Sequence, residues 1–140
     1  MTDANLVYKL LAHLETYIQE LRTLGHPEKI RTDVREERFI EHTLQLAIQA
    51  ALDVASHIVS DDRLGEPKTN REQFEILVRH GWIPEELGET LRQVVGFRNI
   101  LVHGYSDVDL DIVQSIVETD LGDLLAFADA IKARLLEHPA

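Results

Sequence analysis

The sequence predicts an all-α protein, an up-and-down bundle of about five helices that forms a single domain over residues 1–140. Two observations support this prediction. Apolar residues recur every three or four positions along most of the chain, which is the spacing of a helix that buries one face, and the alternation typical of strands is absent. Turn and capping residues separate these stretches by short loops, without repeats or a domain linker.

The first two predicted helices occupy the N-terminal half of the chain. The first ends near Gly25-His26-Pro27. Its apolar stripe consists of Leu6, Val7, Leu10, Leu11, Leu14, Ile18 and Leu21. Asp33 and Glu36 have the spacing of a capping box, which predicts the start of a second helix that runs to about Ser60. This helix is apolar on two opposite sides, so it is either central in the bundle or part of a dimer interface.

Two shorter helices are predicted next. Asn70-x-x-Gln73 predicts the cap of a third helix, which Gly81 closes. Pro84 lies at the start of a fourth helix, and two glutamates follow it in the first turn, where the helix dipole favours acidic groups. We expect this helix to continue to Gly104, a residue suited to the left-handed conformation that ends helices.

A fifth helix is predicted after an Asp-rich turn. Its apolar residues are Ile112, Val113, Ile116, Val117, Leu121, Leu124, Leu125, Ala128, Ile131 and Leu135. Asp107, Asp109 and Asp111 alternate in the turn like ligands of a hard cation, but the glycine and the distal glutamate of a calcium loop are missing. Helix capping explains at least one of them.

The composition excludes several classes of function. The chain has no cysteine, so it has neither disulfides nor thiolate metal sites nor a thiol nucleophile. No apolar run approaches the roughly 20 residues of a membrane span, and the N-terminus lacks a signal pattern, so we expect a cytoplasmic protein without membrane contact. A net charge of −11 argues against a broad nucleic-acid surface, so any RNA contact must be local.

The candidate site is the stretch Arg-Asn-Ile-Leu-Val-His-Gly-Tyr at residues 98–105. A guanidinium holds phosphate in a two-pronged grip, an imidazole moves protons at neutral pH, and a phenol offers a hydroxyl for modification. Taken singly, Arg98 could form a salt bridge, His103 could cap a helix end and Tyr105 could be a half-buried aromatic. The combination favours a functional site over these structural roles, because capping requires neither Asn99 nor Tyr105.

The pattern Arg-Asn-x-x-x-His-x-Tyr resembles the Arg-x4-His motif of HEPN domains, and in particular that of HepT-like toxins, which pair with a minimal nucleotidyltransferase antitoxin. The resemblance covers essentially the whole chain, including the helix order and the long last helix. It implies the toxin of a type VII-like toxin–antitoxin system, an endoribonuclease that needs no metal or other cofactor. In such enzymes the ribose 2′-hydroxyl attacks the adjacent phosphate.

The resemblance also assigns roles by position. Arg98 and His103 match the catalytic pair, and Asn99 matches a polar residue that helps to position them. Tyr105 matches the tyrosine that the antitoxin adenylylates. Family members act as homodimers in which two motifs line one cleft. The alternative function is a non-catalytic HEPN-like module that binds a nucleotide or its partner, and a lesser one is a structural adaptor.

Two further features come from the residues alone. Arg35, Arg38 and His42 form one basic stripe on the second helix, which either borders the RNA path, contacts an acidic partner surface, or pairs with neighbouring glutamates. Asp53 lies in a largely apolar helix and needs a partner, for which Arg98 or His103 is the candidate, making Asp53 an orienting residue. Asp53 and His57 alone would make a poor metal site. The chain carries no nucleotidyltransferase signature, so we do not expect it to transfer AMP itself.

Overall fold

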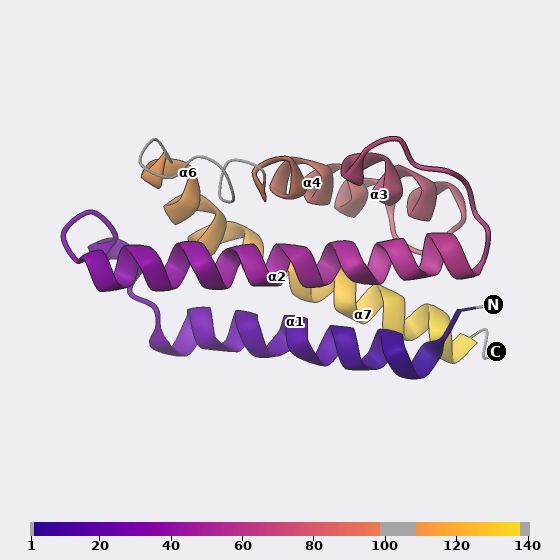
Figure 1. The fold of residues 1–140 in the computed structure, drawn as a ribbon, viewed down its shortest axis with the longest axis horizontal. Coiled ribbons are helices and arrows are strands. Elements are labelled where there is room, and N and C mark those ends of the chain that lie inside the picture. Colours follow the sequence, from indigo (N-terminus) through magenta and orange to yellow (C-terminus); the bar gives the residue numbers. More distant parts are fainter. Residues whose placement is uncertain (1, 99–108, 138–140) are drawn as a thin grey trace.

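The computed structural model describes residues 2–98 and 109–137, and every regular element within these ranges is helical (Figure 1). The elements are α1 (Ala4–Leu24), η1 (Pro27–Lys29), α2 (Val34–Asp61), α3 (Asn70–Arg79), α4 (Glu85–Gly96), α6 (Leu110–Ser115), η3 (Ile116–Asp120) and α7 (Leu121–Glu137). No strand occurs among the described residues. The all-α prediction is therefore confirmed.

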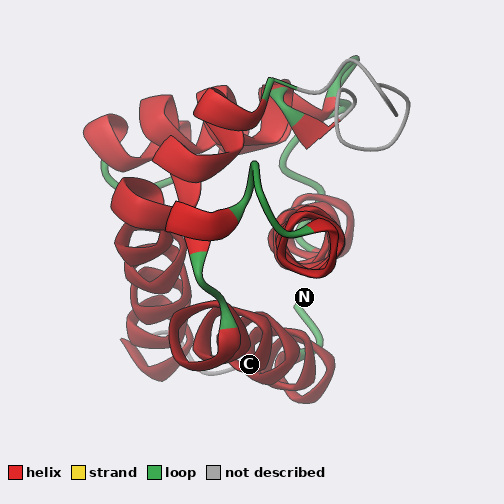
Figure 2. Cartoon of the chain, turned by 90° about the vertical axis from the view of Figure 1, so that its left-hand side faces the viewer, coloured by secondary structure: helices red, strands yellow, loops and turns green. Residues whose placement is uncertain are grey.

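Helix α2 is the centre of the bundle. It runs along the length of the molecule, with α1 on one side and α3 and α4 on the other, and α7 packs against it as well (Figures 1 and 2). Its two apolar sides are both buried within the chain, since Leu44, Ala51 and Ile58 as well as Ile48 and Leu52 are at most 3% exposed. Central packing therefore accounts for the doubly apolar pattern without a second copy.

The start of α2 shows half of the predicted capping box. The Asp33 carboxylate accepts the backbone N–H of Arg35 at 2.9 Å, as a cap should. The Glu36 carboxylate, however, accepts the N–H of His26 at 2.8 Å and not that of Asp33. The reason is that the Asp33 N–H already donates to the carbonyl of Lys29 at 3.0 Å, in the turn that follows η1.

The start of α3 differs from the sequence prediction by one residue. Thr69, not Asn70, is the cap, because the Thr69 hydroxyl accepts the Glu72 N–H at 3.2 Å. Glu72 in turn accepts the N–H of Lys68 at 2.9 Å, so two orphan donors are satisfied. Gly81 closes the helix as predicted, with φ of +78°.

Helix α4 starts after Pro84 as predicted, but it does not continue to Gly104. It ends at Gly96, where the N–H of Phe97 donates to the carbonyl of Val94 at 3.1 Å. A bond to the third preceding residue tightens the last turn and ends the α-helical ladder. Arg98 therefore follows α4 and does not lie within it, and Gly104 is outside the described residues.

The predicted last helix begins at Leu110, two residues before Ile112, the first apolar residue of the predicted stripe, and it contains an irregular turn. The Asp109 carboxylate caps it by accepting the Asp111 N–H at 2.9 Å, which confirms the capping role for one of the three aspartates. A π-helical stretch, η3, separates α6 from α7. No helix within the described ranges is both long enough and apolar enough to cross a bilayer.

Candidate functional site

Arg98 is held by a hydrogen-bonded chain that begins on α2. Its Nε donates to the Oε1 of Gln49 at 2.7 Å, and the Nε2 of Gln49 donates to the Oδ1 of Asp53 at 2.8 Å. Gln49 and Asp53 lie one turn apart on α2, and all three side chains are partly buried. The chain thus connects the central helix to the residue that follows α4.

The carboxylate of Asp53 sets the orientation of the amide. An ionised carboxylate can only accept hydrogen bonds, so it selects the rotamer of Gln49 in which the NH₂ group faces it. That rotamer turns the amide oxygen toward Arg98, where it accepts the Nε–H. Because the guanidinium is planar, a bond at Nε fixes the plane in which its two terminal nitrogens lie.

The structure connects Asp53 to Arg98 indirectly, through the side chain of Gln49. The sequence suggested Arg98 or His103 as the direct partner of Asp53, but the partner that the structure shows is Gln49. His57 lies one turn further along α2. Among the described residues, no three histidine, aspartate or glutamate side chains gather closely enough to hold a metal ion.

Gln49 is the site residue that sequence reasoning missed. A glutamine needs no counter-charge, so nothing in its type singles it out on a helix. The available signal was its spacing, because Gln49 stands four residues before Asp53 in a stretch of the helix, residues 46–55, that is otherwise apolar. Asn99, His103 and Tyr105, the other members of the predicted site, lie outside the described residues.

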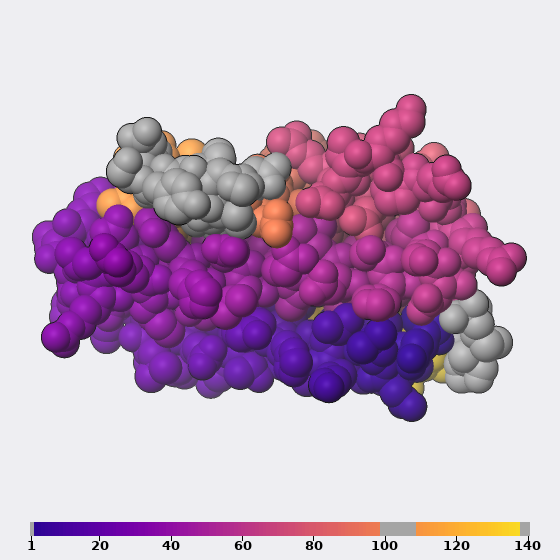
Figure 3. Space-filling view, in the orientation of Figure 1, coloured from indigo at the N-terminus to yellow at the C-terminus, as the bar shows by residue number. Residues whose placement is uncertain are grey.

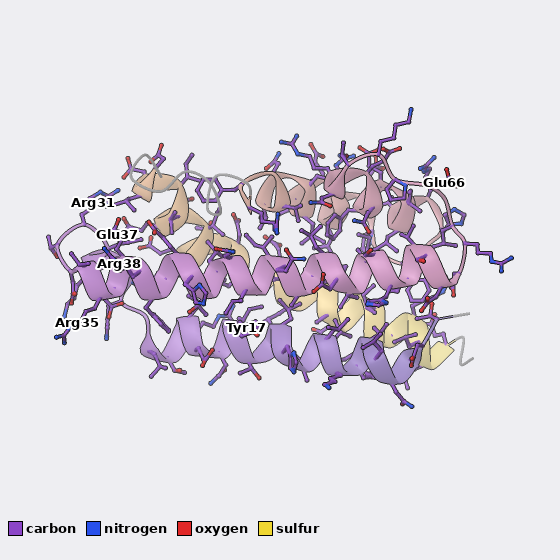
Figure 4. All side chains as sticks on the ribbon, in the orientation of Figure 1. Tyr17, Arg31, Arg35, Glu37, Arg38 and Glu66 are labelled. Atoms are coloured by element: carbon purple, nitrogen blue, oxygen red, sulfur yellow. The ribbon has the colours of Figure 1, made fainter. Side chains whose placement is uncertain are left out.

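Arg35, Arg38 and His42 are exposed residues of α2, and Figure 4 shows Arg35 and Arg38 near the start of this helix. With 100° per residue, all three fall within about 40° of Gln49 around the helix axis. In the part of the chain that the structure describes, no ion pair joins these residues to the neighbouring glutamates. The stripe and the hydrogen-bonded chain therefore share one polar face of the central helix.

Glu41 lies on the same stretch of α2 and has a perturbed acidity. Burial, together with the negative charge of Glu37, raises the pKa of Glu41 above its ordinary value of 4.5, and Arg38 opposes the shift. One carboxyl oxygen of Glu41 is buried without a hydrogen-bond partner among the described residues. The carboxylate form of Glu41 is thus disfavoured by the fold.

A family model and two curated sequences match this chain, and all three are described as HepT nucleases or HepT-like. Residues 12–131 match the family model described as Ribonuclease HepT-like. The chain is 31% identical over 130 residues to the mRNA nuclease HepT of Shewanella oneidensis, and the alignment covers 92% of this chain and 98% of that protein. A shorter match, 38% over 74 residues, is to the tRNA nuclease HepT of Aphanizomenon flos-aquae and covers 53% of this chain and 50% of that one.

A solved structure of a HEPN toxin has the same fold as this chain. The tri-AMPylated HEPN toxin of Shewanella oneidensis, solved in complex with an MNT antitoxin, superposes with a TM-score of 0.84 at 31% identity. The alignment covers 95% of this chain and 99% of that one.

Proposed function

The chain belongs to the Ribonuclease HepT-like family and is a nuclease of the toxin–antitoxin kind, and we propose that it cleaves RNA with Arg98 and His103. The observation that carries this assignment of residues is the hydrogen-bonded chain from Asp53 through Gln49 to Arg98. It supports the assignment because it orients the guanidinium of the arginine that matches the catalytic arginine of the family motif. A surface arginine in a simple ion pair would need no such support.

In the proposed reaction the ribose 2′-oxygen attacks the adjacent phosphorus while the bond from phosphorus to the 5′-oxygen breaks. His103 takes the proton of the 2′-hydroxyl and a proton is returned to the leaving 5′-oxygen. Arg98 stabilises the negative charge that builds on the phosphoryl oxygens, and Asn99 helps to position the pair. The balance leaves a 2′,3′-cyclic phosphate and a 5′-hydroxyl, and no step in it calls for a metal ion.

The ends of the cleaved RNA test this chemistry. We expect products that carry a 2′,3′-cyclic phosphate and a free 5′-hydroxyl, and no cleavage of the same RNA with 2′-O-methyl groups throughout. Fragments with 5′-phosphate ends would exclude attack by the 2′-hydroxyl. Cleavage of the methylated RNA would exclude it as well.

We further propose that Tyr105 is the residue through which a minimal nucleotidyltransferase antitoxin neutralises the enzyme. The similar Shewanella toxin is tri-AMPylated and was solved with an MNT antitoxin. An adenylyl group two residues beyond His103 would add a negative phosphate and a bulky nucleoside beside the proposed RNA site, and so repel and obstruct RNA. Incubation with such a nucleotidyltransferase and ATP should add adenylyl mass and abolish cleavage. A Tyr105→Phe variant that still gains this mass would show that the target is another residue.

Dimerisation and location belong to the same proposal. We propose a homodimer in which two motifs line one cleft, acting in the cytoplasm together with the antitoxin. Light scattering should therefore give twice the 16.0 kDa mass of one chain. A mass of one chain at working concentrations would contradict the shared cleft.

We propose that Arg35, Arg38 and His42 border the RNA path, since their stripe shares a face of α2 with Gln49. Arg35→Glu should weaken RNA binding or cleavage, whereas Arg22→Glu, an exposed charge reversal on α1, should not. If Arg35→Glu changes neither RNA cleavage nor antitoxin binding, the stripe has no such role.

A further inference from the structure

We propose that Arg71 is a second phosphate-binding residue of this ribonuclease, holding an RNA phosphate next to the one held by Arg98. The inference rests on the proposed function, because it deepens the description of the same RNA site. Arg71 lies in the first turn of α3, in a different stretch of sequence from the motif. Nothing in the spacing of the motif points to it.

The guanidinium of Arg71 lies against the end of α4. If Gly96 carried a Cβ, that atom would come within 2.6 Å of Nη2, 2.9 Å of Nε and 3.0 Å of Cζ of Arg71. Any side chain at Gly96 would therefore displace the guanidinium. Since Gly96 precedes Arg98 by two residues, the chain can separate their Cα atoms by at most about 7 Å. The glycine thus lets the Arg71 guanidinium lie beside a backbone position that is two residues from the proposed catalytic arginine.

Two hollows in the surface meet at Arg71 and Gly96. The first, of about 670 Å³, is lined by the chain before α3, by the first residues of α3 and by the end of α4. The second, of about 500 Å³, lies between the end of α4, α6 and the π-helical stretch η3. Figure 3 shows one face of this region, with α3 beside the central helix.

The first hollow is the one suited to phosphate. Lys68 and Arg71 line it, together with the N-terminus of α3, whose dipole favours an anion. Its acidic member, Glu75, is already paired with Arg92 at 2.9 Å. The second hollow is less suited, because it contains Asp111 and Asp120, although Arg31 offsets the charge of Asp111.

Arg71 has no competing partner in the part of the chain that the structure describes. Arg92 pairs with Glu75, and Arg31 pairs with Asp111 and donates to Gln114. The Arg71 side chain is exposed and makes no hydrogen bond or ion pair with a described residue. On a protein with a net charge of −11, an exposed guanidinium that packs against a glycine and forms no ion pair with a described residue marks where RNA can approach.

The test compares two arginine-to-alanine changes on the same helix. Arg71→Ala should raise KM for RNA about tenfold while kcat changes by less than about threefold, because a charge-assisted contact to a remote phosphate is lost. The slope of log kcat/KM against log salt should become shallower by about one phosphate contact. Arg79→Ala, the same change at the exposed far end of α3, should leave KM and the salt slope unchanged.

Gly96→Ala is the second variant, because it keeps the charge of Arg71 and moves only its position. It should raise KM in the same direction as Arg71→Ala, with circular dichroism confirming that the fold is retained. Equal KM and salt slope for Arg71→Ala and Arg79→Ala would overturn the proposal. If the wild type cleaves no RNA, the proposed function fails, and the binding of 2′-O-methyl RNA then decides: weaker binding by Arg71→Ala supports the inference and equal binding overturns it.

Discussion

Gln49 connects the central helix to Arg98, and its amide can serve only in the orientation that Asp53 sets. Removal of the amide leaves the guanidinium present but without the Gln49 hydrogen bond that sets the plane in which it would meet phosphate. Such a change should act on the rate of the chemical step more than on the affinity for RNA. This separates a positioning residue from one that merely binds substrate.

Gln49→Leu should lower kcat about tenfold or more with a small change in KM, because it removes a hydrogen bond to a charged group. Gln45→Leu, one turn earlier on the same helix, is the matched control and should leave kcat close to that of the wild type. In an Arg98→Ala background, Gln49→Leu should cause no further loss. An equal loss in both backgrounds would show that Gln49 acts on stability and not through Arg98.

The raised pKa of Glu41 predicts how the stability of the protein depends on pH. The pKa of the Glu41 carboxyl is raised in the folded protein, so the folded protein binds the carboxyl proton more tightly than the unfolded chain does. Stability is therefore lost as the pH rises from 4.5 through the raised pKa. Glu41→Gln should raise Tm by about 1–3 °C at pH 7.5, a gain of about 0.5 kcal/mol or less because the group is partly solvated. The gain should vanish below pH 4.5, and a gain of the same size at pH 4 and pH 7.5 would contradict this account.

The sequence singled out Asp53 but not Gln49, for a physical reason. A charge in an apolar helix is costly without a partner, so Asp53 stands out from composition alone. Its partner Gln49 lies one turn away on the same helix, but the contact of that amide with Arg98 depends on how the end of α4 lies against α2, which is a property of the packed structure.

At the scale of elements, the end of each helix is set by a few backbone donors and acceptors. Gly81 ends α3 in the left-handed conformation, which ordinary residues adopt at a cost of about 1–2 kcal/mol. Gly122 lies within the last helix, where an added Cβ would meet nothing closer than Arg22 at 3.9 Å. Replacement by alanine should therefore destabilise the protein at Gly81 and stabilise it at Gly122.

Gly81→Ala should lower the free energy of unfolding by about 1–2 kcal/mol, because it forces a Cβ into positive φ and close to Arg134. Gly122→Ala should raise it by about 0.5–1 kcal/mol, because alanine loses less entropy than glycine in a helix. Urea denaturation of both variants measures the difference. A stabilising Gly81→Ala would mean that the turn after α3 has another conformation in solution.

The starts of α2 and α4 could be predicted from the sequence, whereas the cap of α3 was predicted one residue too late. Asp33 and Pro84 were placed correctly, because a cap is a local choice that the residue type itself favours. The end of α4 at Gly96 was not predicted, since the apolar period continues beyond it. The π-helical stretch η3 was missed as well, because one extra residue in a turn barely alters the apolar pattern.

At the scale of the whole molecule, an acidic bundle presents the proposed RNA-binding groups on α2 and around the end of α4. Helix α2 carries Gln49 and the basic stripe, and the end of α4 lies against Arg71 from the start of α3, two residues before Arg98 contacts Gln49. The fold class could be predicted from periodicity alone. The meeting of α2, α3 and α4 could not, because it joins residues that are far apart in the sequence.

The central claim is that Arg98 and His103 cleave RNA without a metal ion. The most direct measurement is the rate of RNA cleavage in EDTA by the wild type, Arg98→Ala, His103→Ala and the control Arg79→Ala, with mass spectrometry showing that Tyr105 is unmodified. We predict full activity for the wild type and the control, and a loss of at least about a hundredfold in kcat for the other two. Cleavage by Arg98→Ala or His103→Ala at the wild-type rate, or loss of wild-type activity in EDTA, would contradict the claim.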